Sequence, residues 1–135
     1  EGQVVLFDKI DTAFTYLDKQ TELFKVVNVP FAGNMSEYCK TAKQAAEEQR
    51  EYFTGPLGND VFQFSPMPWV TYTHVSHTNS GKRDNATPLF DWGKFYERDG
   101  KLLLPFSVQA HHSFVDGLHI GRLAENLQSW LNNYQ

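Results

Sequence analysis

Apolar residues recur at helical spacing in two segments of this sequence, and most of the remaining chain reads as short strands joined by turns. The first segment runs from about residue 35 to residue 53, and the second runs from residue 117 to residue 134. Asn34 or Ser36 can begin the first helix, because their side chains accept hydrogen bonds from unpaired backbone N–H groups. This pattern predicts an α+β fold, in which a mostly antiparallel β-sheet carries helices packed on one face.

The predicted strands are runs that are rich in β-branched and aromatic residues or that alternate apolar with polar residues. Two of them flank Arg98-Asp99-Gly100, and an Asp-Gly pair is a strong signal for a tight hairpin turn. The polar stretch 76–88 predicts an exposed loop. An apolar run at residues 4–7 also looks like part of a strand, and the other predicted strands are 12–17, 23–29, 61–64, 70–75, 89–97 and 101–110.

Composition and charge exclude several classes of protein. A chain of 135 residues with 41% hydrophobic and 21% charged residues fits one globular domain. A formal net charge of −4 without a long basic run argues against nucleic acid as the main partner. No apolar run reaches the roughly 18–20 residues that a membrane span needs, so we expect no membrane partner. The single cysteine, Cys39, is typical of a reducing compartment, and we expect a cytoplasmic protein.

The most chemically distinctive string is His111-His112-Ser113-Phe114-Val115-Asp116-Gly117-Leu118-His119, where the last predicted strand meets the last predicted helix. Imidazole moves protons near neutral pH, and functional residues concentrate at such junctions. Three interpretations fit this string. It is a turn with one hydrogen-bonded histidine, a turn that carries a catalytic base, or a metal site made by His112, Asp116 and His119. The metal interpretation lacks an evident further ligand, so we expect no metal.

The string resembles the His-His-x-x-x-Asp-Gly-x-His signature of the chloramphenicol acetyltransferase family. Ser65-Pro66-Met67-Pro68-Trp69 resembles that family's Ser-x-x-Pro-Trp segment, and Ser65 precedes His112 by 47 residues, in agreement with the family's layout. Gly93-Lys94-Phe95 resembles a Gly-Lys-Tyr piece of its hairpin. The resemblance extends over the chain from start to finish, and it implies a coenzyme A-dependent acyltransferase fold.

The resemblance also implies a reaction and roles in it. The protein would be an O-acetyltransferase that moves acetyl from acetyl-coenzyme A, a co-substrate rather than a tightly bound cofactor, to a hydroxyl of chloramphenicol, and so confers antibiotic resistance. His112 would be the general base, and Ser65 would donate a hydrogen bond to the oxyanion of the tetrahedral intermediate. Asp116 would hold the histidine-bearing turn in shape.

The resemblance implies binding roles for four further residues. Trp69, Lys94 and Phe95 would lie near the coenzyme. Asp91 stands where members of the family have a hydroxyl residue that contacts the acceptor, so it would belong to the substrate site. A carboxylate there changes the polarity of the pocket and leaves the identity of the acceptor open.

The family's chains begin with an additional segment, about their first third, that has no counterpart in this sequence. We therefore expect residues 1–135 to form a single acyltransferase domain that lacks this segment. The resemblance implies a homotrimer with active sites between subunits, and the missing segment suggests a further chain. Two alternatives to chloramphenicol acetylation stay open. One is a same-family acetyltransferase for another hydroxyl acceptor, and the other is a non-catalytic fragment that assembles with a partner chain.

Overall fold

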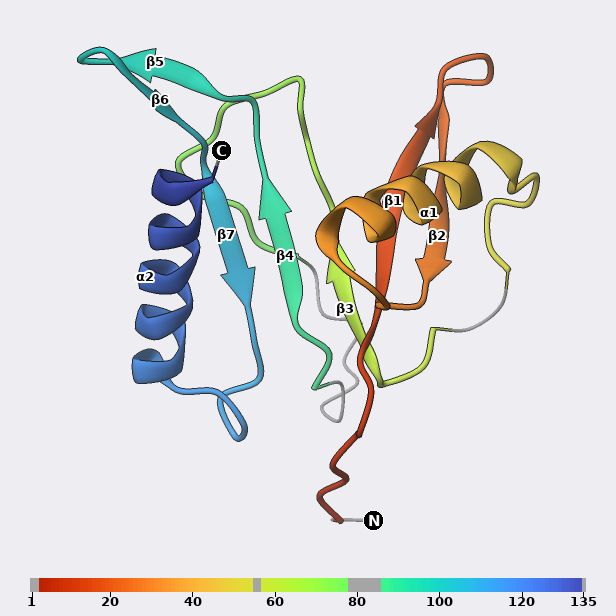
Figure 1. Ribbon diagram of the computed structural model, residues 1–135, viewed down its shortest axis with the longest axis horizontal. Helices are drawn as coiled ribbons and strands as arrows, with labels where there is room; N and C mark the ends of the chain where they lie inside the picture. The colour runs from red at the N-terminus through yellow and green to blue at the C-terminus, as the bar shows by residue number, and fades with distance from the viewer. Residues whose placement is uncertain (1–2, 55–56, 78–85, 135) are drawn as a thin grey trace.

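The computed structural model describes residues 3–54, 57–77 and 86–134, and its centre is a five-stranded sheet (Figure 1). The strands of this sheet follow the order β2-β1-β3-β4-β7, and β5 and β6 form a separate two-stranded ribbon. The strand bounds are β1 Asp11–Asp18, β2 Leu23–Val29, β3 Val61–Phe64, β4 Leu89–Trp92, β5 Tyr96–Arg98, β6 Lys101–Leu103 and β7 Phe106–Gln109. The two helices are α1, Met35–Glu48, and α2, Gly117–Asn133.

The sheet is mixed, which refines the predicted mostly antiparallel pairing. β1 pairs with β2 and β4 pairs with β7 in antiparallel fashion, whereas β3 lies parallel to both β1 and β4. The parallel pairing of β1 with β3 arises because the chain leaves β2, passes through α1 and returns on the other side of β1, and parallel neighbours need such a crossover. The predicted α+β class is confirmed.

Helix α1 begins as predicted and ends earlier than predicted. Asn34 is its cap: Glu37 N donates to Asn34 Oδ1 at 3.0 Å, and Asn34 N donates to Glu37 Oε2 at 3.1 Å. The helix stops at Glu48 rather than near residue 53, because Gln49 turns to an extended conformation with ψ 128°. The side chain of Gln49 then donates to the Val26 carbonyl at 2.9 Å, which draws residues 49–52 alongside β2.

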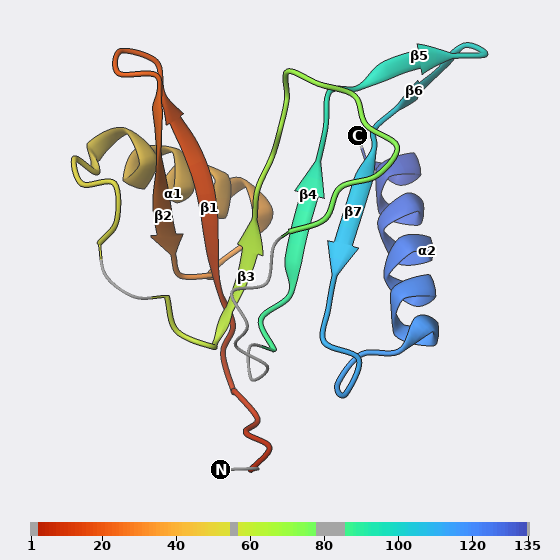
Figure 2. The ribbon, with the colours of Figure 1, turned by 180° about the vertical axis from the view of Figure 1, so that it is seen from behind.

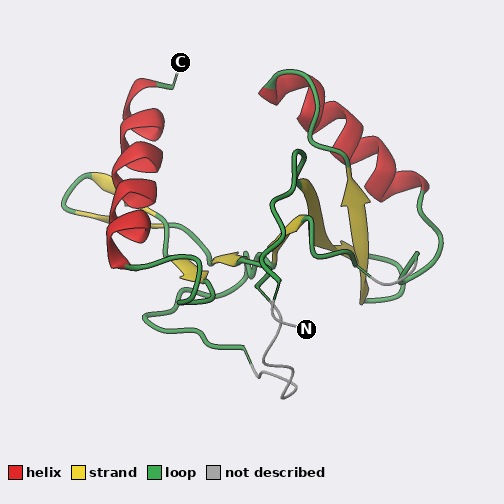
Figure 3. Cartoon of the chain, turned by 90° about the horizontal axis from the view of Figure 1, so that it is seen from below, coloured by secondary structure: helices red, strands yellow, loops and turns green. Residues whose placement is uncertain are grey.

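The core lies between α1 and the β1–β2 pair. Val27, Val29 and Ala46 are almost fully buried there, with Phe14 and Tyr38 packed against them. Figure 3 shows both helices on the same side of the sheet, as predicted, and α1 packs there through Ala46. On that side, burial of a few aliphatic side chains and the rings around them supplies the apolar contact that joins helix to sheet.

The same face of the sheet carries a row of aromatic side chains between the helices. The register places Phe62 and Phe64 of β3 beside Phe90 and Trp92 of β4, and Phe106 of β7 follows. Neighbouring rings of this aromatic row have centroids 5.2–6.2 Å apart. Helix α2, which is described in full, buries none of its residues. The aromatic row and the apolar side of α2 are therefore only partly covered.

The long hairpin is present but interrupted. Asp99 and Gly100 both have positive φ, 54° and 71°, which is the conformation of a type I′ turn between β5 and β6. Each predicted arm is broken into two strands, so β4 pairs with β7 and β5 pairs with β6. At the break, Gly93 N still donates to the Pro105 carbonyl at 3.0 Å, while Lys94 N donates across to the Val70 carbonyl at 2.7 Å.

Two predicted strands are wrong. Residues 70–75 form no strand, because their segment leaves the sheet after Met67 and runs over β4 and β7 on the face away from the helices (Figure 2). Residues 4–7 form no strand either, and Val4 and Leu6 are largely exposed. In the predicted loop, residues 76, 77 and 86–88 are irregular as expected, and residues 78–85 lie outside the described part. In that part, no helix combines the length and the apolar character that crossing a membrane requires.

Candidate active site

Ser65 lies directly beyond the carboxyl end of β3 and extends its pairing with β4. Ser65 N donates to the Phe90 carbonyl at 2.9 Å, and Met67 N donates to the Trp92 carbonyl at 2.8 Å. The alternate residues, Pro66 and Pro68, have no N–H to donate, so the prolines stand where the ladder needs no donor. The sequence of this segment therefore fixes its extended course and the position of the Ser65 backbone.

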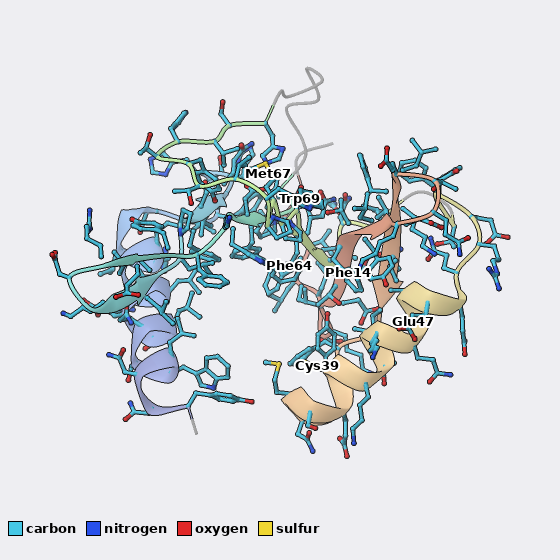
Figure 4. All side chains as sticks on the ribbon, turned by 90° about the horizontal axis from the view of Figure 1, so that it is seen from above. Phe14, Cys39, Glu47, Phe64, Met67 and Trp69 are labelled. Carbon is cyan, nitrogen blue, oxygen red and sulfur yellow. The ribbon has the colours of Figure 1, made fainter. Side chains whose placement is uncertain are left out.

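Two cavities meet at Ser65. The larger one, about 530 Å³, is mostly apolar and includes Tyr16, Phe24 and Trp69 in its lining. The smaller one, about 210 Å³, has a lining that includes Gln63, His77 and Leu89. Ser65 and Thr15 line both cavities. In Figure 4, with the helices at the bottom, Met67 and Trp69 lie on the side of the sheet away from α1, and Phe14 and Phe64 lie nearer to α1.

Asp91 is a buried carboxylate beside the smaller cavity. Its side chain is 1% exposed, and its Oδ1 lies 2.9 Å from His77 Nε2. The hydroxyl of Tyr72 is also buried, and within the described part of the chain neither it nor Asp91 Oδ2 has a hydrogen-bond partner. Burial, and in addition the negative charge of Asp91, raise the pKa of Tyr72 above its ordinary value of 10.0. Asp91, His77 and Tyr72 therefore form one polar cluster within largely apolar surroundings.

His112 lies on the turn between β7 and α2, and it is exposed. The turn is closed by Phe114 N and Val115 N, which donate to the His111 carbonyl at 3.0 and 3.1 Å. Ser113 N donates to His111 Nδ1 at 3.2 Å, while His112 Nδ1 is 3.4 Å from the Val115 carbonyl. This geometry leaves the His112 imidazole on the surface, where it can meet another molecule.

Asp116 occupies the position before the first residue of α2. Its Oδ1 lies 3.0 Å from His119 Nδ1, and both side chains are more than half exposed. Such an exposed pair contributes little stability, and the Asp116 N–H also donates to His119 Nδ1 at 3.2 Å. Among the described residues, no three His, Cys, Asp or Glu side chains gather closely enough to hold a metal ion, so the geometry does not support the metal interpretation of His112, Asp116 and His119.

The structure does not bring His112 and Ser65 together within one chain. Gln109 is level with Leu89, so the chain continues to His112 beyond the start of β4, whereas Ser65 is level with the middle of that strand. Ser65 and His112 are also separated sideways by two strand spacings, roughly 10 Å. Figure 1 shows the turn before α2 at the lower end of the sheet, away from the carboxyl end of β3. His112 lines neither of the two cavities.

The three residues predicted near the coenzyme lie on two neighbouring segments. Two hydrogen bonds join these segments at Lys94. Its backbone N–H donates to the Val70 carbonyl, and its carbonyl accepts from Thr71 Oγ1 at 2.9 Å. Trp69 and Phe95 are each 63% exposed. The structure thus brings Trp69, Lys94 and Phe95 to one part of the surface, beside the larger cavity that Trp69 lines.

His77 is the residue that the sequence did not single out. Histidines in irregular segments are common, and nothing in the neighbourhood of His77 distinguishes it from His74, which is exposed. The sequence feature that could have pointed to His77 is Asp91, which interrupts the apolar strand Leu89-Phe90-Asp91-Trp92. A buried carboxylate requires a hydrogen-bonding partner.

A family model described as "Chloramphenicol acetyltransferase" matches residues 1–128. This chain belongs to the chloramphenicol acetyltransferase family. Among curated relatives with that name, one from Streptomyces acrimycini is 34% identical over 134 residues, covering 96% of this chain and 61% of its own length. One from Escherichia coli is 29% identical over 139 residues, covering 100% of this chain and 63% of its own. The chain therefore spans less than two thirds of these relatives.

Solved structures support the fold assignment. A chloramphenicol acetyltransferase superposes with a TM-score of 0.74 at 22% identity, over 86% of this chain and 58% of its own. The dihydrolipoamide acetyltransferase of Azotobacter vinelandii superposes with a TM-score of 0.64 at 16% identity, over 98% of this chain and 57% of its own. The predicted acyltransferase fold is confirmed.

Proposed function

We propose that this protein takes part in acetyl transfer from acetyl-coenzyme A to a hydroxyl acceptor, with chloramphenicol as the first candidate. The observation that carries the proposal is the pair of family motifs and where they lie: His112 is exposed on the turn before α2, and Ser65 lies where two cavities meet. Membership of the chloramphenicol acetyltransferase family supports this reaction. The single cysteine supports a cytoplasmic location for the protein.

The proposed reaction needs one base and one oxyanion donor. His112 removes the proton as the acceptor's hydroxyl oxygen attacks the thioester carbon, and Ser65 donates a hydrogen bond to the oxyanion that forms. Collapse of the intermediate breaks the carbon–sulfur bond, and the proton held by His112 goes to the departing coenzyme A sulfur. Asp116 keeps the His112 turn in shape, while Trp69, Lys94 and Phe95 contact the coenzyme.

We further propose that each site forms between two copies of the chain, within a homotrimer. His112 and Ser65 lie apart in one chain, so the His112 of one copy must approach the Ser65 of another to act on the same intermediate. The exposure of His112 supports this arrangement. A third of the relatives' length has no counterpart here, and we propose that such a segment, in this chain or in another, completes the domain.

Release of free thiol from acetyl-coenzyme A in the presence of chloramphenicol tests the activity. We expect His112→Ala to lower kcat about 10²–10⁴-fold and Ser65→Ala to lower it about 10²–10³-fold. His74→Ala, at an exposed histidine outside the proposed site, is the matched control and keeps its activity. An unchanged rate in His112→Ala would show that the base is another group.

A mixing experiment tests the site between copies. Unfolding His112→Ala and Ser65→Ala together and refolding them as a mixture would pair an intact His112 with an intact Ser65 in some of the assemblies. We expect the mixture to recover part of the wild-type rate, although each variant alone is nearly inactive. A mixture as inactive as its components, with mixed assemblies verified by native mass spectrometry, would place both groups in one chain's own site.

Two alternatives have specific support. His77, which is bonded to the buried Asp91, adds a polar side chain to the lining of the smaller cavity, and another hydroxyl acceptor that matches it is the first alternative; thiol release with another alcohol and none with chloramphenicol would establish this. The partly covered aromatic row and α2 favour a non-catalytic fragment that assembles with a partner chain. A chain that stays monomeric by light scattering and releases no thiol with any acceptor would favour this second alternative.

A further inference from the structure

The polar cluster around Asp91 contains a charge that the fold has to accommodate. Asp91 lies in the middle of β4 with its side chain 1% exposed, and an ionised carboxylate at such a position is costly unless it is hydrogen-bonded. Among the described residues its hydrogen-bond partner is His77, whose Nε2 lies 2.9 Å from Oδ1. A carboxylate has no proton to donate, so Nε2 must carry the hydrogen of this bond.

This bond determines what the other side of the imidazole offers. When Nε2 carries the hydrogen of a neutral ring, Nδ1 has none and is a hydrogen-bond acceptor. The side chain of His77 is 34% exposed, and it lines the smaller cavity together with Gln63 and Ser65. Phe64, Leu57 and Leu89 make much of the rest of that cavity apolar. His77, with Nδ1 as an acceptor in this tautomer, thus lines a mostly apolar cavity whose lining also includes Ser65.

Asp91 is a positioning residue in this arrangement rather than a residue that touches a ligand. It does not line the smaller cavity, and its neighbour Tyr72 is a half-buried residue whose ring lies near Gly93. His77 therefore lies between Asp91 and the cavity. The carboxylate fixes the orientation and the tautomer of the imidazole, in the way that a hydrogen-bonded carboxylate does for other functional histidines.

We propose that His77, oriented by Asp91, selects acceptors that carry a second hydroxyl close to the hydroxyl that is acetylated. Diols belong to this class, and simple monohydric alcohols do not. This inference rests on the proposed function, because it takes the smaller cavity as the acceptor's side of Ser65. A pocket that accepts a hydrogen bond from its ligand discriminates against a ligand without the donor, because the ligand then covers the acceptor without pairing it.

The kinetic test compares two acceptors and two histidine variants. The acceptors are chloramphenicol and an analogue in which the hydroxyl that is not acetylated is replaced by hydrogen. We expect His77→Leu to lower kcat/KM about tenfold for chloramphenicol and to change it little for the analogue. His77→Gln, whose amide oxygen can accept a hydrogen bond, restores part of the loss. His74→Leu is the matched control. An equal loss for both acceptors in His77→Leu would overturn the proposal.

A second measurement does not depend on acetyl transfer. Nitrogen-15 NMR of the histidines reports which ring nitrogen carries hydrogen, and we expect His77 to be protonated at Nε2 and bare at Nδ1. Adding chloramphenicol without coenzyme is expected to shift the Nδ1 resonance, and Asp91→Asn is expected to weaken the tautomer preference. If no acceptor releases thiol but these NMR results are obtained, the proposed function fails and the role of His77 stands. Hydrogen at Nδ1, or no response of that resonance to saturating chloramphenicol, overturns the role of His77.

Discussion

Gly93→Ala should destabilise the protein strongly, because the added methyl group would meet a backbone oxygen rather than a flexible side chain. Gly93 lies at the break between β4 and β5, where the Val70 segment crosses the sheet. A Cβ at this position would lie 2.6 Å from the Val70 carbonyl oxygen and 2.9 Å from Pro105 Cγ. The carbonyl cannot simply move away, because it accepts the hydrogen bond of Lys94 N at 2.7 Å.

The cost of Gly93→Ala has two parts. Inserting a methyl group into a packed site costs about 1–3 kcal/mol, and weakening the bond from Lys94 N to the Val70 carbonyl adds about 0.5–1.5 kcal/mol. We therefore expect the free energy of unfolding to fall by about 2–4 kcal/mol. A small domain has about 5–15 kcal/mol in total, so the variant loses a large share and its Tm falls by about 10 °C.

Urea unfolding followed by circular dichroism measures this loss. Gly121→Ala is the matched control, because it makes the same chemical change on the surface of α2, where a Cβ meets nothing within 4 Å. Removing a glycine from a helix favours the helix by up to about 1 kcal/mol, so this control is expected to be at least as stable as the wild type. If Gly93→Ala unfolds within 0.5 kcal/mol of the wild type, a threshold of about one weak hydrogen bond, the close crossing at Gly93 is wrong.

Three further predictions concern single contacts. Asn34→Ala removes the cap of α1 and should cost about 0.5–2 kcal/mol in urea unfolding, whereas Asn34→Asp should retain most of the stability. Thr12→Val removes the bonds from Thr12 Oγ1 to the Val29 carbonyl and to Tyr38 OH, and should cost about 1–2 kcal/mol; no loss would mean that neither bond stabilises the core. Backbone N–H bonds from the following turn lower the pKa of Asp18 below 3.8, so the stability that they add is present above pH 3.8 and is lost as the pH falls through the lower, folded-state pKa. An NMR titration of the Asp18 carboxyl at or above 3.8, or the same acid unfolding curve in Asp18→Asn, would contradict this.

The elements that the sequence predicts best are those specified by neighbouring residues. The spacing of apolar residues locates α2, and Asp99-Gly100 locates the β5–β6 turn, because helical periodicity and turn conformation depend on a few adjacent residues. The end of α1 depends instead on a contact from Gln49 to Val26, which is 23 residues away in the sequence. The parallel position of β3 likewise depends on where the chain returns after α1, which no short window of sequence specifies.

In the candidate site, too, some features follow from neighbouring residues and others depend on residues far apart in the sequence. The motifs at Ser65 and His112 are local strings, and the sequence alone places them at a strand end and at a turn before a helix. The distance between Ser65 and His112 depends on the register of three strands, so the sequence does not reveal that one chain leaves them apart. The His77–Asp91 bond joins residues 14 positions apart across an irregular segment, and only the burial of Asp91 in an apolar strand points to it.

Helix α2 holds one end of the His112 turn, and it buries none of its residues. An isolated helix of 17 residues is marginal in water, so hydrogen exchange in α2 should be fast compared with exchange in β1 and β2. A helix that frays in this way lets the imidazole before it sample many orientations, and each orientation that misses the acceptor lowers the effective molarity of the base. Whatever polypeptide covers the aromatic row and α2 would also restrict His112, so completion of the core would itself raise the rate of the acetyl transfer that we propose.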